Sequence, residues 1–380
     1  MSYLPGTLVV STSRLPSPIV AVTLPPMHRF SLRGAALLAV AASSLSVAQA
    51  QGSAEYRVTF DATWSNQTHP NAFIGSAHFS PLIGASHSSA LEVWAPGGIA
   101  SSGIEQMAET GGTSILTQEV NAAIGAGTAL ERILGGGVGI SPGTASGTFT
   151  ATTEFPLVSL VTMIAPSPDW FVGVHGVSMV ENGQFVDDLT IQLFAYDSGT
   201  DSGANFTSPN QNTNPQQPIS LLTAGPFTGA TALGTFRFER LHSSLVYGAG
   251  NPAGSLELVA GEPRVGQSLT IAIDDPTASF GAPAPTFLAI AGAPDAAFPG
   301  GTILPGFGLG PVGTPGELLI GGPFVLQVGP TWSGAPSNGT LPIPSSPSLV
   351  GIDVYLQGVV VDLVQLRSGL TRGLELHIGA

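Results

Sequence analysis

The chain has 380 residues, of which only 9% are charged, and its formal net charge at pH 7 is −14. All ten cationic residues are arginine, so lysine-dependent chemistry, such as a Schiff base or a P-loop lysine, is excluded. The acidic balance, without any polybasic run, argues against nucleic acid as a partner. Because cysteine is absent, disulfides, thiolate zinc sites and cysteine nucleophiles are excluded as well.

The N-terminal segment predicts secretion. Arginines follow Met27, an apolar stretch runs from 35 to 47, and Ala48-Gln49-Ala50 has the small residues of a cleavage site. The apolar stretch is too short to span a bilayer, so no transmembrane span is expected. We expect residues 27–50 to be a signal peptide cleaved after Ala50, and the mature protein to be secreted, extracellular or periplasmic. Residues 1–26 are then an artefact of the assigned gene start or a disordered leader.

The remaining sequence predicts a mainly β protein. Gly and Pro are abundant, and the apolar runs are short and rich in Val, Ile, Leu and Thr, which favours many short strands joined by turns. Residues 101–110 instead have the pattern of a short helix that ends at Gly111-Gly112, and 113–134 has room for one or two more helical turns. Alternation predicts strands at 56–64, 147–152, 157–164, 170–174, 189–196, 234–241, 254–260, 267–273, 323–328, 349–357 and 374–378.

The length of the mature chain allows two domains, each with its own core. We place them at 51–244 and at 245–380, where a second β-rich unit begins near Tyr247. Between 280 and 317, Gly, Pro and Ala dominate, so long ordered loops or partial disorder are expected there.

Three aspartates form the strongest candidate site. Asp169 precedes a Trp-Phe-Val strand, whereas Asp197 and Asp201 lie four apart in a Gly/Ser segment that follows an apolar strand. If loops at one end of a sandwich bring them together, the three carboxylates repel each other unless a cation neutralises them. Ca2+ takes ~6–8 oxygen ligands at ~2.3–2.6 Å, whereas Mg2+ demands a stricter octahedron. The sequence therefore predicts a Ca2+ site, although an Asx-turn loop would account for the same pattern.

Several segments, in a shared order over about residues 54–240, resemble the spondin N-terminal domain, also known as the F-spondin (FS) domain. The segments that carry the resemblance are 56–64, His69-Pro70, His78-Phe79-Ser80-Pro81, Ser86-His87, 91–98, 100–103, Ala108-Glu109-Thr110-Gly111, 167–174 and 197–203. The resemblance implies a C2-like antiparallel β-sandwich with Ca2+ held between loops at one end, and Asp169, Asp197 and Asp201 as the metal ligands. The cysteines of the animal proteins are missing here, and so are their flanking reeler and thrombospondin repeats. Residues 245–380 are similar to a β-rich C-terminal accessory module of secreted bacterial proteins, so a bacterial-type protein is expected.

These observations favour a non-catalytic, secreted, Ca2+-binding adhesion protein. Its expected partners are an extracellular matrix, envelope or glycan component, or an anionic surface reached through Ca2+. Two alternatives stay open: an extracellular hydrolase with a β-sandwich accessory domain, and a purely structural surface protein. No G-x-S-x-G motif occurs, and the histidines lack metal-site spacing, so we expect His78 and His87 to organise loops. The four tryptophans are expected to be core or turn anchors.

Overall fold

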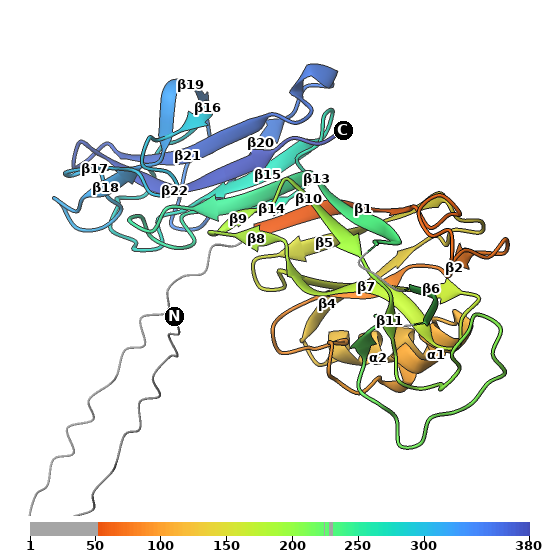
Figure 1. Cartoon of the computed structure of the whole chain (residues 1–380). Helices are drawn as coiled ribbons and strands as arrows, with labels where there is room; N and C mark the ends of the chain where they lie inside the picture. Colours follow the sequence, from red (N-terminus) through yellow and green to blue (C-terminus); the bar gives the residue numbers. More distant parts are fainter. Residues whose placement is uncertain (1–51, 224, 228–230) are drawn as a thin grey trace, which may run out of the picture. The chain divides into compact units, whose positions relative to one another are not determined.

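The computed structural model describes residues 52–223, 225–227 and 231–380 (Figure 1). The predicted leader and signal peptide, residues 1–50, lie outside this part. Strands predominate in the described residues and pair antiparallel, which confirms the mainly β prediction. None of the helices in this part has the length and apolar character needed to cross a lipid bilayer.

One 15-stranded sheet runs through the described residues, in the order β12-β11-β7-β6-β3-β4-β5-β1-β13-β22-β21-β16-β19. Off this path, β10 pairs with β13, and β2 pairs with β6. The elements of the first half are β1 (Gly52–Ala62), β2 (His78–Phe79), β3 (Ile83–His87), α1 (Ser102–Thr110), α2 (Ser114–Gly125), β4 (Ala129–Gly135), β5 (Gly143–Thr152), β6 (Leu157–Ala165), β7 (Trp170–Ser178), β8 (Val180–Glu181), β9 (Gln184–Phe185), β10 (Asp188–Leu193), β11 (Tyr196–Asp197), β12 (Ser220–Leu221) and β13 (Gly234–Tyr247).

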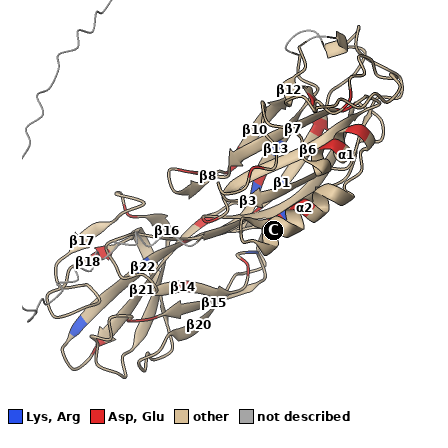
Figure 2. Ribbon diagram, turned by 90° about the horizontal axis from the view of Figure 1, so that it is seen from below, with Lys and Arg blue, Asp and Glu red and all other residues tan. Residues whose placement is uncertain are grey.

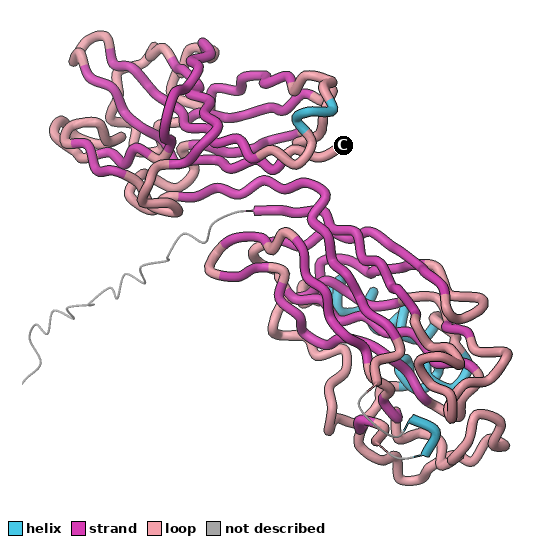
Figure 3. The backbone as a smooth tube through the Cα atoms, turned by 45° about the horizontal axis from the view of Figure 1, so that its top comes forward, coloured by secondary structure: helices cyan, strands magenta, loops and turns pink. Residues whose placement is uncertain are grey.

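Two apolar clusters hold the first half together. The larger one is centred on aromatic side chains from β1 and β13, such as Phe60 and Phe236, whose ring centroids lie 5.3 Å apart. The second fills the space between the helices and strands β3, β6 and β7, with Met107 of α1 and Leu116 of α2 fully buried against Phe171. Figure 3 shows both helices beside the strands of this half. The helices thus cover the part of the sheet that is formed by β3, β6 and β7.

The predicted first helix is confirmed by its ends. The Ser101 side chain accepts a hydrogen bond from the Ile104 backbone amide, and Gly111 adopts φ 70° at the C-terminus, where residues other than glycine are strained. The prediction for 113–134 was partly wrong, because α2 has 12 residues and the segment then continues into β4. The β4 backbone pairs with β3, a contact between segments distant in sequence that local spacing does not reveal.

The second half contributes its own strands and its own apolar clusters. Leu269, Leu356 and Leu374 are among the fully buried residues of its main cluster. Its elements are β14 (Leu256–Ala260), β15 (Ser268–Ile273), β16 (Thr286–Pro294), β17 (Thr302–Leu304), β18 (Gly316–Leu318), β19 (Ile320–Val328), β20 (Ser337–Pro342), β21 (Asp353–Asp362) and β22 (Arg367–His377).

The expectation of long ordered loops between 280 and 317 was partly wrong, because β16 and β17 lie in this range and β18 begins at its end; the residues between these strands are ordered loops. β16 pairs with β21 on one side and with β19 on the other. This two-sided pairing compensates for the weak strand preference of its Ala and Gly residues.

β13 links the two halves in the described chain. It pairs with β1 from Gly234 to Leu245, and with β22 from Ser243 to Tyr247. The expected closing strand at 234–241 is therefore longer than predicted. The apolar clusters on either side are separate, but the domain boundary at 244–245 stays a prediction, because β13 runs through it.

All four tryptophans are buried, as predicted. The exposed fractions are 0% for Trp64, 4% for Trp94, 1% for Trp170 and 3% for Trp332. The indole N–H of Trp64 donates to the Ala72 carbonyl oxygen at 2.7 Å. These side chains are core anchors and offer no exposed aromatic platform for a glycan.

Candidate functional site

Strand pairing brings two of the three predicted ligands together. β11 pairs antiparallel with β7, so Asp197 lies opposite Trp170, the residue that follows Asp169. Just beyond β11, the Ser198 backbone amide donates to the Asp169 carbonyl oxygen at 3.2 Å. The loop that carries Asp201 starts at this point, so all three aspartates lie at the same end of the sheet.

Asp169 is the buried centre of this loop. Its exposed fraction is 0%. Its Oδ2 accepts hydrogen bonds from Ser198 Oγ at 2.9 Å, from the Thr200 amide at 2.8 Å and from the Asp201 amide at 3.0 Å. Its Oδ1 is also buried, but has no hydrogen-bond partner among the described residues. An unpaired buried carboxylate oxygen is costly, so this atom is an open position for an electropositive ligand.

The other two carboxylates shape the loop through backbone amides. Asp197 Oδ1 accepts from the Gly199 amide at 2.8 Å. Asp201 accepts from the Gly203 amide at 2.6 Å and from the Gln211 amide at 2.9 Å. In both aspartates, a side-chain oxygen accepts from the backbone amide two residues further along the chain. This is the geometry of an Asx turn, the alternative that the sequence left open. The structure therefore contains these turns at the predicted ligands.

Gly199 is required by the path of the loop. Its φ is +77°, and a Cβ atom built there would lie 2.1 Å from the Gln217 carbonyl oxygen. Any side chain at this position would push the loop away from the segment that contains Gln217. The glycine thus lets the backbone turn tightly enough for Ser198, Thr200 and Asp201 to donate to Asp169 together.

Burial makes the negative charges of this loop unfavourable. It raises the pKa of the Asp169 carboxyl, and the nearby charge of Asp201 raises it further, against the hydrogen bonds that lower it. Burial, followed by the charge of Asp169, raises the pKa of Asp197 to about 6. The loop therefore holds anions that a nearby cation would stabilise.

Glu109 is a neighbouring carboxylate that the sequence analysis did not single out. It is half-buried near the end of α1, and its Oε1 has no hydrogen-bond partner among the described residues. Burial raises the pKa of Glu109 and the hydrogen bond with the Thr200 side chain lowers it, while the charges of Glu105, Asp201 and Asp169 raise it further. We call Asp169, Asp197, Asp201 and Glu109 the acidic cluster. Figure 2 shows the acidic residues of α1 near those of the adjoining strands and loops.

A pattern in the sequence could have revealed Glu109. Glu105 and Glu109 are four apart in a helix that was predicted, so both project from the same face. The Gln216 side-chain amide donates to Glu105 Oε2 at 3.0 Å, which connects this face to the loop that follows Asp201. The proximity of the helix to the loop is a tertiary contact, and spacing alone does not predict it.

The chemistry of the acidic cluster fits a hard divalent cation, but its arrangement is not a ready-made metal site. Its donors are carboxylate oxygens, which Ca2+ prefers, and two of these oxygens are buried and unpaired. Within the described residues, however, no three His, Asp or Glu side chains are already placed as a metal-binding group. In the structure, Asp197 Oδ1 and both carboxylate oxygens of Asp201 accept hydrogen bonds from backbone amides of the loop.

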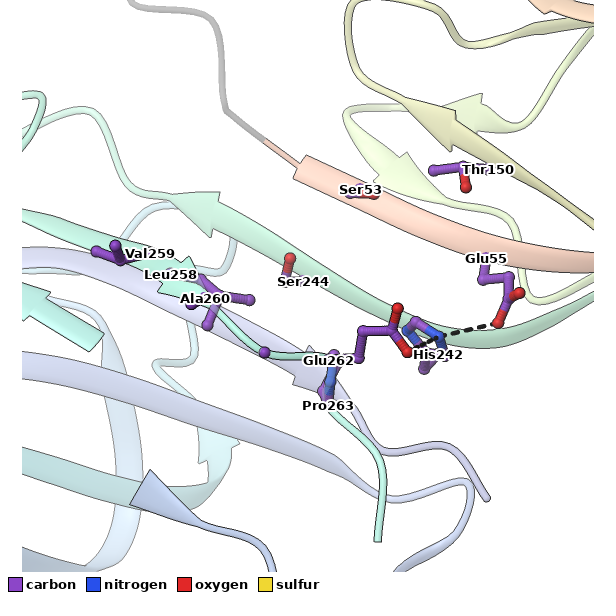
Figure 4. Close-up of a pocket in the computed structure, with 11 residues that line it drawn as sticks. Ser53, Glu55, Thr150, His242, Ser244, Leu258, Val259, Ala260, Glu262 and Pro263 are labelled. Atoms are coloured by element: carbon purple, nitrogen blue, oxygen red, sulfur yellow. Dashed lines mark hydrogen bonds and ion pairs between the residues drawn. The ribbon is translucent and has the colours of Figure 1, made fainter. Parts of the chain in front are cut away.

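A second polar site lies where β13 passes from β1 to β22. A pocket of about 280 Å3 is lined there by Glu55, His242 and Glu262, together with Thr150 and Ser244 (Figure 4). Its charges are already paired: His242 Nε2 lies 3.0 Å from Glu55 Oε2 and 3.8 Å from Glu262 Oε2.

Arg264 completes this ionic network. It contacts Glu55 Oε2 through Nη2 and approaches Glu262 Oε2 to 2.9 Å through Nε. Burial, and then the charge of Arg264, lowers the pKa of His242, against the neighbouring glutamates. The network thus stabilises the local structure, and Arg264 engages both Glu55 and Glu262.

Glu55→Gln is expected to reduce the free energy of unfolding by about 1.5 kcal/mol, because Arg264 loses a partly buried anionic partner. Urea unfolding followed by circular dichroism measures this loss, and Glu92→Gln, at an exposed position, serves as the control. A change of less than about 0.5 kcal/mol would mean that the network contributes little.

The histidines organise loops, as predicted. His87 is 2% exposed, with its Nε2 2.9 Å from Ser159 Oγ and its Nδ1 2.8 Å from the Ser88 carbonyl oxygen. The hydroxyl partner is Ser159, on the adjacent strand β6. His78 Nδ1 contacts the Ser76 carbonyl oxygen at 2.7 Å. These contacts fix loops and strand ends.

Known proteins are similar to the first half of the chain. Residues 54–232 match the family model described as Spondin_N. Spondin-2 from Rattus norvegicus is 35% identical over 207 residues, which cover 52% of this chain and 61% of that protein. Spondin-2 from Homo sapiens is 36% identical over 188 residues, covering 47% of this chain and 55% of the relative. Spondin-1 from Gallus gallus is 34% identical over 179 residues, covering 46% of this chain and 22% of the relative.

The matched region has two consequences. The chain spans between 22% and 61% of the length of these relatives, so they inform us about one domain rather than about a whole protein. The matched range contains Asp169, Asp197, Asp201 and Glu109, and therefore the whole acidic cluster. The comparisons give no support to the expected bacterial-type character, because these relatives come from vertebrates.

Proposed function

Because residues 54–232 match the Spondin_N family model, we propose that they form a spondin N-terminal domain and that the chain is a non-catalytic extracellular protein that binds Ca2+ through its acidic cluster. In this proposal, Ca2+ binding orders one loop edge of the domain, and that edge makes an adhesive contact. The partner is an extracellular matrix, envelope or glycan component, or an anionic surface that shares the Ca2+. The protein reaches this location through the signal peptide predicted at residues 27–50.

The observation that carries the proposal is the buried, unpaired Oδ1 of Asp169 beside two further aspartates. A protein that needed only an Asx-turn loop would gain nothing from burying a carboxylate oxygen without a partner. Asp169, Asp197 and Asp201 would hold the ion, with backbone carbonyls and water completing its shell. Glu109 is close enough to contribute charge from the adjacent helix.

The bound ion would supply positive charge at a place where burial already disfavours carboxylates. Ca2+ binding would keep Asp197 ionised near neutral pH, although burial raises the pKa of this carboxyl to about 6. Ca2+ would also stiffen the loop from Asp197 to Asp201, because both aspartates would bind the same ion. A stiffened loop loses less conformational entropy when a partner binds, and this favours adhesion.

Asp197→Asn is expected to remove the stabilisation by Ca2+. In the wild type, Ca2+ at about 100 times its dissociation constant should add about 2.7 kcal/mol to the free energy of unfolding and raise Tm. The variant keeps the shape of the side chain but loses one charge, so its Tm should be the same in Ca2+ and in chelator. Calorimetric titration of the purified chain measures the Ca2+ dissociation constant, and thermal unfolding measures Tm with and without Ca2+.

Asp188→Asn is the matched control, because Asp188 is exposed and pairs with Arg237 on β13. This variant should respond to Ca2+ as the wild type does. An equal Ca2+-dependent rise in Tm for Asp197→Asn would refute the site. The adhesive role is tested separately, by comparing binding to matrix and cell-wall material in Ca2+ and in chelator.

A further inference from the structure

β19 is an unpaired edge of the large sheet. It is the last strand in the order of the 15-stranded sheet, and it pairs antiparallel with β16 only. Figure 1 shows β19 beside β16, with no strand of the described chain along its other side. One row of its backbone N–H and C=O groups therefore faces outward, where it can pair with another strand.

The side chains of this edge are apolar and exposed. The exposed fractions are 53% for Phe324, 68% for Val325, 53% for Leu326 and 74% for Val328. Successive residues of a strand point to opposite faces, so apolar surface is exposed on both faces of the edge. No charged residue occurs between Ile320 and Val328, in a chain whose net charge is −14.

Other edge strands of the described chain are protected in ways that β19 lacks. β12 has only two residues, and β10 begins with the charged Asp188. β20 exposes the polar residues Asn338 and Thr340 and ends at Pro342. Short length, charge and proline are the usual devices that prevent edge pairing. Of these devices β19 has only Pro323, near its start, where a register shift also interrupts its pairing with β16 between Ala291 and Ala293.

We propose that β19 is a dimer interface, at which it pairs antiparallel with β19 of a second copy of this chain. The outward row of backbone groups can pair with another strand, and the exposed apolar side chains favour a strand that is itself apolar. β19 itself meets both needs. Antiparallel pairing about a two-fold axis places the same uncharged segment opposite itself, so no like charges meet across the ladder.

Pairing of this kind would extend the sheet across two copies. It would satisfy the outward backbone groups and bury Phe324, Val325, Leu326 and Val328 of each copy against their counterparts. The contact lies in the second half of the chain, outside the matched range of residues 54–232. It is therefore independent of the proposed Ca2+ site.

Val325→Lys tests the interface in the full purified chain. The substitution places a charge on each β19, and two-fold pairing brings the two charges close together. In light scattering coupled to size exclusion, the wild-type mass should double between about 1 μM and about 100 μM, whereas the variant should stay monomeric. Val364→Lys is the matched control, because Val364 is 86% exposed in the turn between β21 and β22.

Hydrogen exchange gives a second readout. Amides of 324–328 should become more protected as the wild-type concentration rises, and this change should be absent in Val325→Lys. A wild type that stays monomeric at about 100 μM would overturn the proposal. So would a Val325→Lys variant that dimerises as well as the wild type, or a loss of dimer in Val364→Lys alone.

Discussion

Asp169→Ala is expected to reduce the free energy of unfolding by about 3 kcal/mol in the presence of a chelator. The side chain is fully buried, and its Oδ2 accepts hydrogen bonds from Ser198 Oγ and from the amides of Thr200 and Asp201. Removing the acceptor leaves these donors buried without a partner, and each such donor costs about 1–3 kcal/mol. Loss of the repulsion with Asp197 and Asp201 offsets part of this cost.

Asp169→Asn separates the hydrogen bonds from the charge. Its amide oxygen can still accept from Thr200 and Asp201, so the loss in chelator should be about 1 kcal/mol, well below that of Asp169→Ala. Both variants should fail to gain stability from Ca2+ if the proposed site is correct. Urea unfolding measures the free energy of unfolding of both variants, each with Ca2+ and in chelator. Equal losses of stability for the two variants in chelator would contradict the role assigned to Oδ2.

Glu375→Gln is expected to stabilise the protein by about 3 kcal/mol at about pH 8, and to have little effect near pH 4.5. Glu375 lies in β22, is 6% exposed, and has an Oε2 with no hydrogen-bond partner among the described residues. Burial raises the pKa of its carboxyl to about 7; Arg240 acts in the opposite direction, and Asp353 and Asp187 add to the rise.

The sign of the effect follows from proton binding. Between its ordinary pKa and about 7, Glu375 is protonated in the folded state and ionised in the unfolded state. Its contribution to the free energy of unfolding therefore falls as pH rises through this window, and is lowest above pH 7. Glutamine stays neutral at every pH, so the variant should escape this loss.

Glu181→Gln, at an exposed position, is the control for this pH dependence. It should change the free energy of unfolding equally at both pH values, by less than about 0.5 kcal/mol. Unfolding by urea at a series of pH values provides the comparison. If Glu375→Gln shifts stability by the same amount near pH 4.5 and near pH 8, the buried carboxyl is not the origin of the effect.

Local patterns in the sequence predicted the elements that local forces determine. Alternation of apolar residues indicated β1 and β6, and the Ser101 cap with Gly111 marked both ends of α1. Sequence could not predict β16, because its Ala-rich composition favours a strand only once β19 and β21 pair with it. The same holds for β4, which β3 stabilises from a distant part of the chain.

The acidic cluster was predictable in part. The spacing of Asp197 and Asp201, after an apolar strand, correctly indicated a loop that returns to Asp169. What the spacing could not show is that Asp197 and Asp201 accept from backbone amides of their own loop. Glu109 was missed because its approach depends on how α1 packs beside the loop. The Ca2+ assignment itself stays a prediction until the titration is done.

The continuity of β13 affects how the molecule can come apart. Leu245 is in register with Gly52 of β1 on one side and with Glu375 of β22 on the other, whereas two residues further on Tyr247 is in register with Gly373 of β22. Unfolding of either half would remove β1 or β22 from the side of β13 and leave backbone groups of β13 without hydrogen-bond partners. The two halves should therefore unfold cooperatively. A fragment that ends at residue 244 would expose unpaired backbone groups of β13 and should be prone to aggregation.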